Sequence, residues 1–268
     1  MKSEILNRKY EPLSLLFAAI GGLVLLFIVA PLISMFVNCS AAELTQTAKD
    51  PEVRNSIRLT LWTSMAATIL FAFAAIPFSY LLARKNFPLK GLVTGIIDLP
   101  IVIPHTAAGL ALLSVVSKSG YLGKLADKAG LNFVGSSAGI IMAMAFVSIP
   151  YLLNSARDGF IAVPVRLEKA ALNLGASPLR VFLTISVPLA SRSIVSGLIL
   201  MWARGMSEFG AVLIIAYHPM ITPVLIYERF GAFGLKYARP VAVIFVSVCL
   251  VFFIILRLLV REKNVAHR

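Results

Sequence analysis

Long apolar stretches separated by short polar segments run along the whole chain. The uncharged or nearly uncharged stretches are 12–42, 59–83, 99–117, 129–156, 190–216 and 240–260. A helix needs about 20 mainly apolar residues to cross a bilayer, and each stretch is close to that length or longer. The pattern therefore predicts six membrane-spanning helices, at about 13–37, 57–83, 91–116, 136–155, 190–216 and 239–260.

These spans predict an all-α integral membrane fold. Backbone groups without hydrogen-bond partners are costly in lipid, and the alternating pattern of a β-barrel is missing. The sequence contains no soluble domain, low-complexity linker or convincing internal repeat, so residues 1–268 are predicted to form a single transmembrane domain. Secondary transporters usually carry two related halves, whereas six spans without a repeat are more typical of half of a dimeric pore.

The strong positive charge is explained by orientation in the membrane. The sequence is 59% hydrophobic and carries a formal net charge of +13. With both ends of the chain inside, the inner segments contain 15 of the 25 Lys and Arg residues and the outer segments contain 8. This excess follows the positive-inside rule, so we predict cytoplasmic N- and C-termini and no nucleic-acid partner.

Motifs for phosphate binding, metal binding and covalent chemistry are missing from the sequence. The nearest approach to a P-loop, at Gly123-Lys124, has Lys118 in place of the first glycine and Leu125 after the lysine. Zinc-site spacings are lacking, and three scattered histidines do not predict a metal site. A Ser-His-Asp arrangement stays open on composition alone, but nothing resembles a nucleophile elbow. We predict no enzymatic activity, no cofactor and no metal, and expect another chain to supply energy.

The segment 156–190 is the longest water-facing one and is predicted to form two short helices with a sharp turn between them. Pro164 suits the first turn of the first helix. The apolar stripe of this helix has helical spacing and consists of Leu167, Ala170, Ala171 and Leu174. Gly175 suits the left-handed residue that ends a helix, and Ser177 followed by Pro178 suits the start of the next one. A small helix of this kind can sit in a groove of another protein.

The same segment resembles the EAA loop of ABC importer permeases. From Glu168 to Pro188 it reads E-x-A-A-x3-G-x9-I-S-V-P, against the family pattern E-A-A-x3-G-x9-I-x-L-P. Two positions depart, because Lys169 separates the acid from the alanine pair and Val187 replaces leucine. The resemblance implies a type I ABC importer permease fold, in which this cytoplasmic loop docks into a cleft of an ATPase subunit. The residues implied in coupling are Leu167, Glu168, Ala170, Ala171, Gly175, Ala176, Ser177 and Pro178.

A second resemblance indicates the transported solute. The stretches Asp98–Leu112 and Trp202–Phe230 resemble the third and fifth spans of molybdate/tungstate permeases, with sulfate permeases close behind. This implies a homodimeric pore in the plasma membrane of a prokaryote, two ATPase subunits on the cytoplasmic side and an extracytoplasmic oxyanion-binding protein. A sulfate or thiosulfate ABC permease stays open as an alternative. Two alternatives from other classes of protein also stay open: an ion-coupled secondary transporter, and a membrane scaffold or enzyme.

Two charged residues in the fifth span are further candidates. Arg204 and Glu208 are one helical turn apart, which predicts an ion pair that faces protein or water rather than lipid. Asp98 could extend this network. The pair either fixes the fifth span against its neighbours or places Arg204 beside the pore, where its charge would favour a dianion. The sequence leaves both interpretations open.

Two prolines in the third span predict a helix break. Pro100 and Pro104 each lack a backbone donor, so we expect them to interrupt the helix as part of a gate. His105, which follows directly, is expected to be a hydrogen-bonded packing residue rather than a ligand.

Overall fold

The computed structural model describes the backbone of residues 2–259 and the side chains of residues 13–256. Every regular element in this range is a helix, so the predicted all-α fold is confirmed for it. The elements are α1 (Lys2–Val37), α2 (Ala41–Lys49), α3 (Pro51–Arg84), α4 (Lys90–Val102), α5 (His105–Val116), α6 (Tyr121–Lys128), α7 (Ser137–Ala162), α8 (Val165–Asn173), α9 (Pro178–Val181), the π-helix η1 (Phe182–Ser186), α10 (Val187–Met206), α11 (Gly210–Ile215), α12 (Thr222–Phe233) and α13 (Leu235–Leu259).

Five helices in the described range are long and apolar enough to cross a membrane. They are Leu13–Val37, Pro51–Arg84, Ser137–Ala162, Pro178–Met206 and Leu235–Leu256. A sixth crossing is present if α4 and α5 are counted as one bent span. Residue 1 and residues 260–268, the predicted cytoplasmic ends of the chain, lie outside the described residues, so their side of the membrane stays a prediction.

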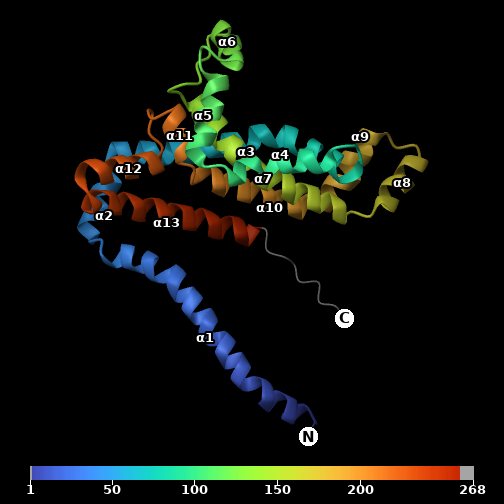
Figure 1. Cartoon of the computed structure of the whole chain (residues 1–268), viewed down its shortest axis with the longest axis horizontal. Helices are drawn as coiled ribbons and strands as arrows, with labels where there is room; N and C mark the ends of the chain where they lie inside the picture. Colours follow the sequence, from blue (N-terminus) through green and yellow to red (C-terminus); the bar gives the residue numbers. More distant parts are fainter. Residues whose placement is uncertain (1, 260–268) are drawn as a thin grey trace.

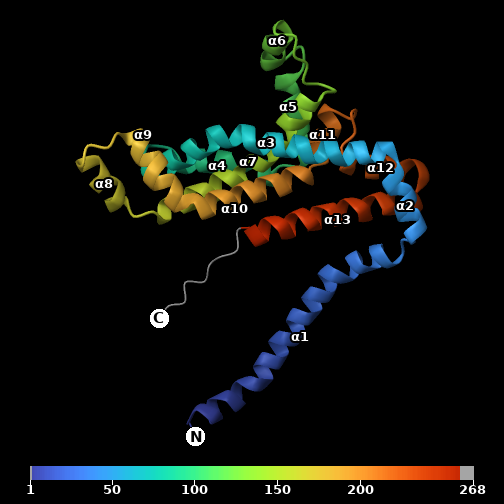
Figure 2. The same ribbon diagram turned by 180° about the vertical axis from the view of Figure 1, so that it is seen from behind.

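The core of the bundle is formed by α3, α7 and α10, which lie side by side (Figures 1 and 2). Small residues let α7 and α10 approach closely. A Cβ atom added at Gly159 would lie 2.4 Å from Cβ of Ser193, and one at Gly197 would lie 2.9 Å from Cβ of Ser155. The hydroxyl of Ser155 also donates to the carbonyl of Ser193 at 2.7 Å. Larger side chains at these glycines would therefore push the two helices apart.

The predicted span 91–116 consists of two helices, α4 and α5, with a bend of 114° between them. The break falls at Ile103–Pro104. Pro104 has no N–H to donate to the carbonyl of Pro100 one turn earlier, so the helical hydrogen-bond ladder stops there. Pro100 itself is buried inside α4, so only the second proline marks the break. Beyond it, α5 and α6 project from the bundle (Figure 1).

The predicted span 190–216 is not one helix either. α10 continues without a gap from α9 and η1, ends at Met206, and is separated from α11 by Ser207–Phe209. The Glu208 carboxylate accepts a hydrogen bond from the backbone N–H of Ala211 at 2.8 Å. An acidic side chain therefore satisfies a free donor in the first turn of α11, which favours starting a new helix there.

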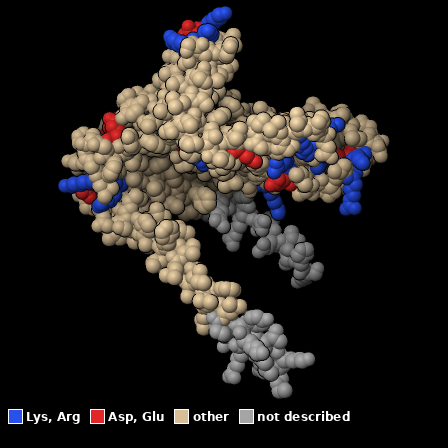
Figure 3. Space-filling view, in the orientation of Figure 1, with Lys and Arg blue, Asp and Glu red and all other residues tan. Residues whose placement is uncertain are grey.

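The two ends of the bundle carry different elements. α8 and α9 lie at one end, and α2 and α12 lie at the other (Figure 1). Lys and Arg side chains gather near α8, near α12 and on the tip of α6, whereas the flank of the bundle is largely uncharged (Figure 3). α1 stands apart from the bundle, and its apolar window within Leu13–Val37 has no buried residue. These uncharged surfaces are the ones expected of helices that lie in lipid.

Candidate functional site

The segment between α7 and η1 folds as the predicted helix, turn and helix. Pro164 precedes the first residue of α8, and the backbone of Gly175 has a left-handed φ of +86°. The hydroxyl of Ser177 accepts from the N–H of Arg180 at 3.3 Å and so caps α9, with Pro178 in its first turn. Turn residues thus fix where each helix ends, and we call residues 165–178 the α8 segment.

Most of the α8 segment is exposed at the tip of the bundle. Leu167 is 41% exposed and Leu174 is 88% exposed. The other predicted coupling residues are also exposed or half-buried, apart from Glu168: Ala170, Ala171, Gly175, Ala176, Ser177 and Pro178. Much of the predicted apolar stripe is therefore exposed on this chain, where its side chains can contact another protein.

Glu168 is the exception, because it is only 5% exposed and points into the bundle. Its carboxylate accepts hydrogen bonds from Arg84 Nε at 2.9 and 3.1 Å, from Arg84 Nη2 at 2.9 Å and from the Ser186 hydroxyl at 2.7 Å. Burial opposes ionisation of this carboxyl group, but the hydrogen bonds from Arg84 and Ser186 outweigh it and lower its pKa. Sequence reasoning placed Glu168 off the apolar stripe but missed this partner.

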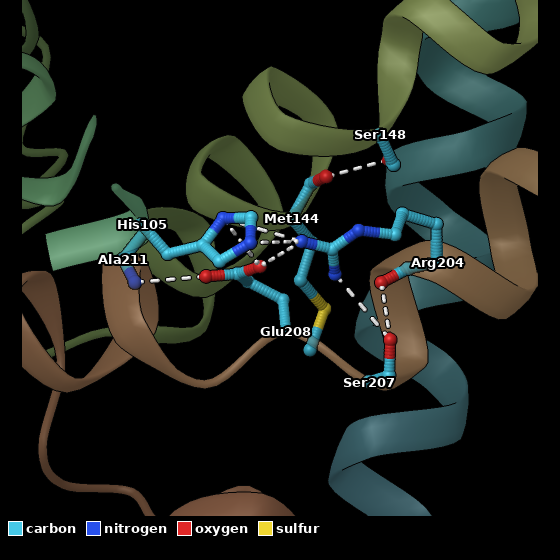
Figure 4. Close-up of polar contacts among 7 residues, drawn as sticks. All are labelled: His105, Met144, Ser148, Arg204, Ser207, Glu208 and Ala211. Carbon is cyan, nitrogen blue, oxygen red and sulfur yellow. Dashed lines mark hydrogen bonds and ion pairs between the residues drawn. The ribbon is translucent and has the colours of Figure 1, made fainter. Parts of the chain in front are cut away.

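The second candidate site is a cluster of His105, Arg204 and Glu208 inside the bundle, here called the Arg204 cluster (Figure 4). His105 begins α5, Arg204 lies near the end of α10, and Glu208 lies in the break that follows. The Arg204 cluster lies beside the first half of the 26-residue helix α7, because a Cβ atom on the adjacent Gly205 would lie 3.7 Å from Cβ of Met144. The predicted ion pair between Arg204 and Glu208 forms even though α10 ends at Met206, between the two residues.

The geometry of the Arg204 cluster joins one cation to one carboxylate. Arg204 Nη2 lies 3.0 Å from Glu208 Oε2, which is within ion-pair distance but not aligned as a hydrogen bond. The same nitrogen lies 2.8 Å from Nε2 of His105. Arginine only donates, so this ring nitrogen accepts. The Glu208 side chain is 1% exposed, whereas those of Arg204 and His105 are 19% and 43% exposed, so the carboxylate is buried and its two partners reach the surface of this chain.

The remaining candidate residues, Asp98, Pro100 and Pro104, are not part of the Arg204 cluster. Asp98 Oδ1 accepts a hydrogen bond from Asn154 Nδ2 at 2.6 Å, so this contact holds α4 against α7 and is separate from the ion pair. Pro104 is adjacent to His105 of the Arg204 cluster, whereas Pro100 lies within α4. Within the residues that the structure describes, no three His, Cys, Asp or Glu side chains come together as a metal site.

Helices long and apolar enough to cross a membrane, with an exposed helix–turn–helix at one end of the bundle, indicate a multi-pass membrane protein. The family described as binding-protein-dependent transport system inner membrane component matches residues 75–265. The chain therefore belongs to this family of ABC importer permeases and is a multi-pass protein of the plasma membrane.

The chain is also similar to individual permeases and to one solved transporter structure. The chain is 45% identical over 251 residues to the molybdate/tungstate transport system permease protein WtpB of Thermococcus kodakarensis, which covers 93% of this chain and 96% of the relative. It is 32% identical over 209 residues to a probable sulfate transport system permease protein of Chlorokybus atmophyticus, with 76% and 73% covered. A solved chain of a bacterial ABC transporter involved in alginate import has a TM-score of 0.73 at 17% identity, with 97% and 99% covered. That likeness confirms the importer permease fold.

Proposed function

We propose that the chain is the pore-forming subunit of an ATP-driven, binding-protein-dependent importer of molybdate or tungstate. Two copies would form the pore, two separate ATPase subunits would dock on the cytoplasmic loops, and an oxyanion-binding protein would deliver the solute from outside. The observation that carries the proposal is the α8 segment, whose apolar side chains stand exposed beside a left-handed turn at the tip of the bundle. An exposed apolar stripe on a short helix suits the groove of a partner protein.

The α8 segment is connected to the spans in a way that suits coupling. Only two residues separate the end of α7 from the start of α8, and α9, η1 and α10 follow one another without a gap. A displacement of α8 would therefore pass directly to α7 and α10. ATP binding would close the ATPase pair and switch the pore between two states, which is a coupling of distant sites.

The substrate class rests on the relatives. Identity to the molybdate/tungstate permease is higher, and covers more of both chains, than identity to the sulfate permease. This difference favours molybdate or tungstate over sulfate as the imported oxyanion, with a sulfate or thiosulfate permease as the alternative within the class.

The Arg204 cluster would contribute little affinity for the solute. Glu208 offsets the charge of Arg204 at 3.0 Å, and the pair connects the end of α10 to the start of α5 through His105. We propose that the cluster mainly braces these helices at the edge of the pore. Selectivity would then be set by the binding protein, where a soluble pocket can surround the anion with donors.

Purification of the tagged chain from its native membrane tests the proposal. An ATPase subunit should accompany the chain in equal amounts. After reconstitution with this ATPase and the binding protein, vesicles should take up molybdate or tungstate only when ATP is present. Uptake by the chain alone on an ion gradient would support the secondary transporter instead, and a preference for sulfate would support the sulfate permease.

A further inference from the structure

Glu168 is the only buried residue among the nine of α8. A helix of this length is not stable by itself in water, so contacts with the rest of the chain must hold it in place. Apolar packing supplies only part of these contacts, because Val165, Leu167 and Leu172 of α8 are each more than 40% exposed. The carboxylate of Glu168 is therefore the main attachment of α8 to the bundle.

Arg84, the last residue of α3, makes most of this attachment. Its Nε and Nη2 atoms both donate to the Glu168 carboxylate, which is the planar, two-point geometry that arginine forms and lysine cannot. Arg84 Nη2 also donates to the carbonyl of Val163 at 3.0 Å, just after the end of α7. One guanidinium group thus connects the ends of α3 and α7 to α8.

The other contacts at this joint come from η1 and from an aromatic group. Ser186, the last residue of η1, donates its hydroxyl to Glu168 at 2.7 Å, which adds the start of α10 to the connection. The Tyr80 ring lies 5.7 Å from the Arg84 guanidinium carbon, and it packs on Phe160 and Phe182 at centroid distances of 5.3 and 5.0 Å. Tyr80 thus covers the arginine of the ion pair and is itself held in place by Phe160 and Phe182.

We propose that Arg84 is the positioning residue of the coupling loop, fixing α8 to the ends of α3, α7 and α10 so that these helices move with it. This inference rests on the proposed function of the α8 segment. It also assigns Glu168 an internal role, because its carboxylate is buried and accepts hydrogen bonds from Arg84 and Ser186 of the same chain. A partner would then contact the exposed stripe of α8, and loss of Glu168 would act through the placement of that stripe.

The variant Arg84→Gln tests the inference, with Lys85→Gln as the matched control. Lys85 is the next residue, carries the same charge and is exposed. Both variants are reconstituted with the ATPase and binding protein, and ATP hydrolysis is measured together with oxyanion uptake. We expect Arg84→Gln to keep the ATPase bound but to take up at least about tenfold less oxyanion per ATP hydrolysed, since several charge-assisted hydrogen bonds are lost. Lys85→Gln should match the wild type.

Amide hydrogen exchange of the purified chain in detergent supplies a second readout. The amides of α8 should exchange at least about tenfold faster in Arg84→Gln, while those of α7 and α10 stay protected. Wild-type uptake per ATP, or unchanged protection of α8, would overturn the inference. If Arg84→Gln does not accumulate, Ser186→Ala replaces it, with the same two measurements and the same criteria. If the wild-type chain binds no ATPase, the proposed function fails, whereas exchange of α8 still tests the role of Arg84.

Discussion

Replacing Gly175 by valine should weaken docking of the ATPase without disturbing the membrane bundle. Gly175 has a φ of +86°, and a Cβ atom built there would meet nothing within 4 Å. The cost therefore comes from the backbone alone: a left-handed conformation costs an L-residue about 1–2 kcal/mol, and β-branching adds to it. One or two kcal/mol corresponds to a factor of about 5–30 in an equilibrium. The native turn would be populated less by that factor.

The assay is a titration of the purified permease with the ATPase subunit, together with the abundance of each variant in the membrane. We expect Gly175→Val to raise the Kd for the ATPase by about 5–30-fold at near-normal abundance, following the population of the turn. Gly175→Asn should cost less, because asparagine visits the left-handed region more readily. Gly231→Val controls for added bulk, since Gly231 is equally open but has no left-handed φ. Wild-type affinity in Gly175→Val, with uptake unaltered, would refute the reasoning.

Four other outcomes are expected. Arg204→Ala should destabilise the detergent-solubilised protein by up to about 3–5 kcal/mol in thermal unfolding, because it leaves Glu208 buried and unpaired. The double variant Arg204→Ala with Glu208→Gln should recover part of this stability. Wild-type stability in the single variant would contradict the pairing. Because the native pKa of Glu168 is lowered, the stability that its carboxylate gives the protein is complete above the ordinary value of 4.5 and is lost as the pH falls through the native value. The difference in Tm between wild type and Glu168→Gln should therefore vanish in acid. A constant difference would refute this. Lys169→Glu should transport normally, since Lys169 is exposed, and a large loss of uptake would argue against this. In calorimetry, the permease–ATPase complex without binding protein should bind molybdate only weakly, because Glu208 offsets Arg204, and micromolar binding would count against it.

Features set by local chemistry could be predicted from the sequence. Gly175 and Ser177 mark the ends of short helices because their backbone and side-chain preferences act within a few residues, and both lie where the pattern placed them. Apolar length likewise indicated helices long enough to cross a membrane, although the predicted spans 91–116 and 190–216 are each broken in the structure.

Features set by distant contacts could not be predicted. The inward orientation of Glu168 depends on Arg84, which is 84 residues away in sequence. Similarly, the contacts of Arg204 and Glu208 with His105 join two different predicted spans, and the predicted span 190–216 did not reveal them. Asp98 shows the same limit, because depth in the membrane does not reveal that its partner is Asn154.

The breaks at Ile103–Pro104 and Ser207–Phe209 also limit where lipid can be. Both adjoin the Arg204 cluster, beside the first half of α7. Each break leaves backbone amides and carbonyls without helical partners, and acyl chains offer them none. Those backbone groups must therefore be shielded from the acyl chains by protein or water. Next to the backbone at the two breaks, the barrier across the membrane is then protein and water rather than lipid.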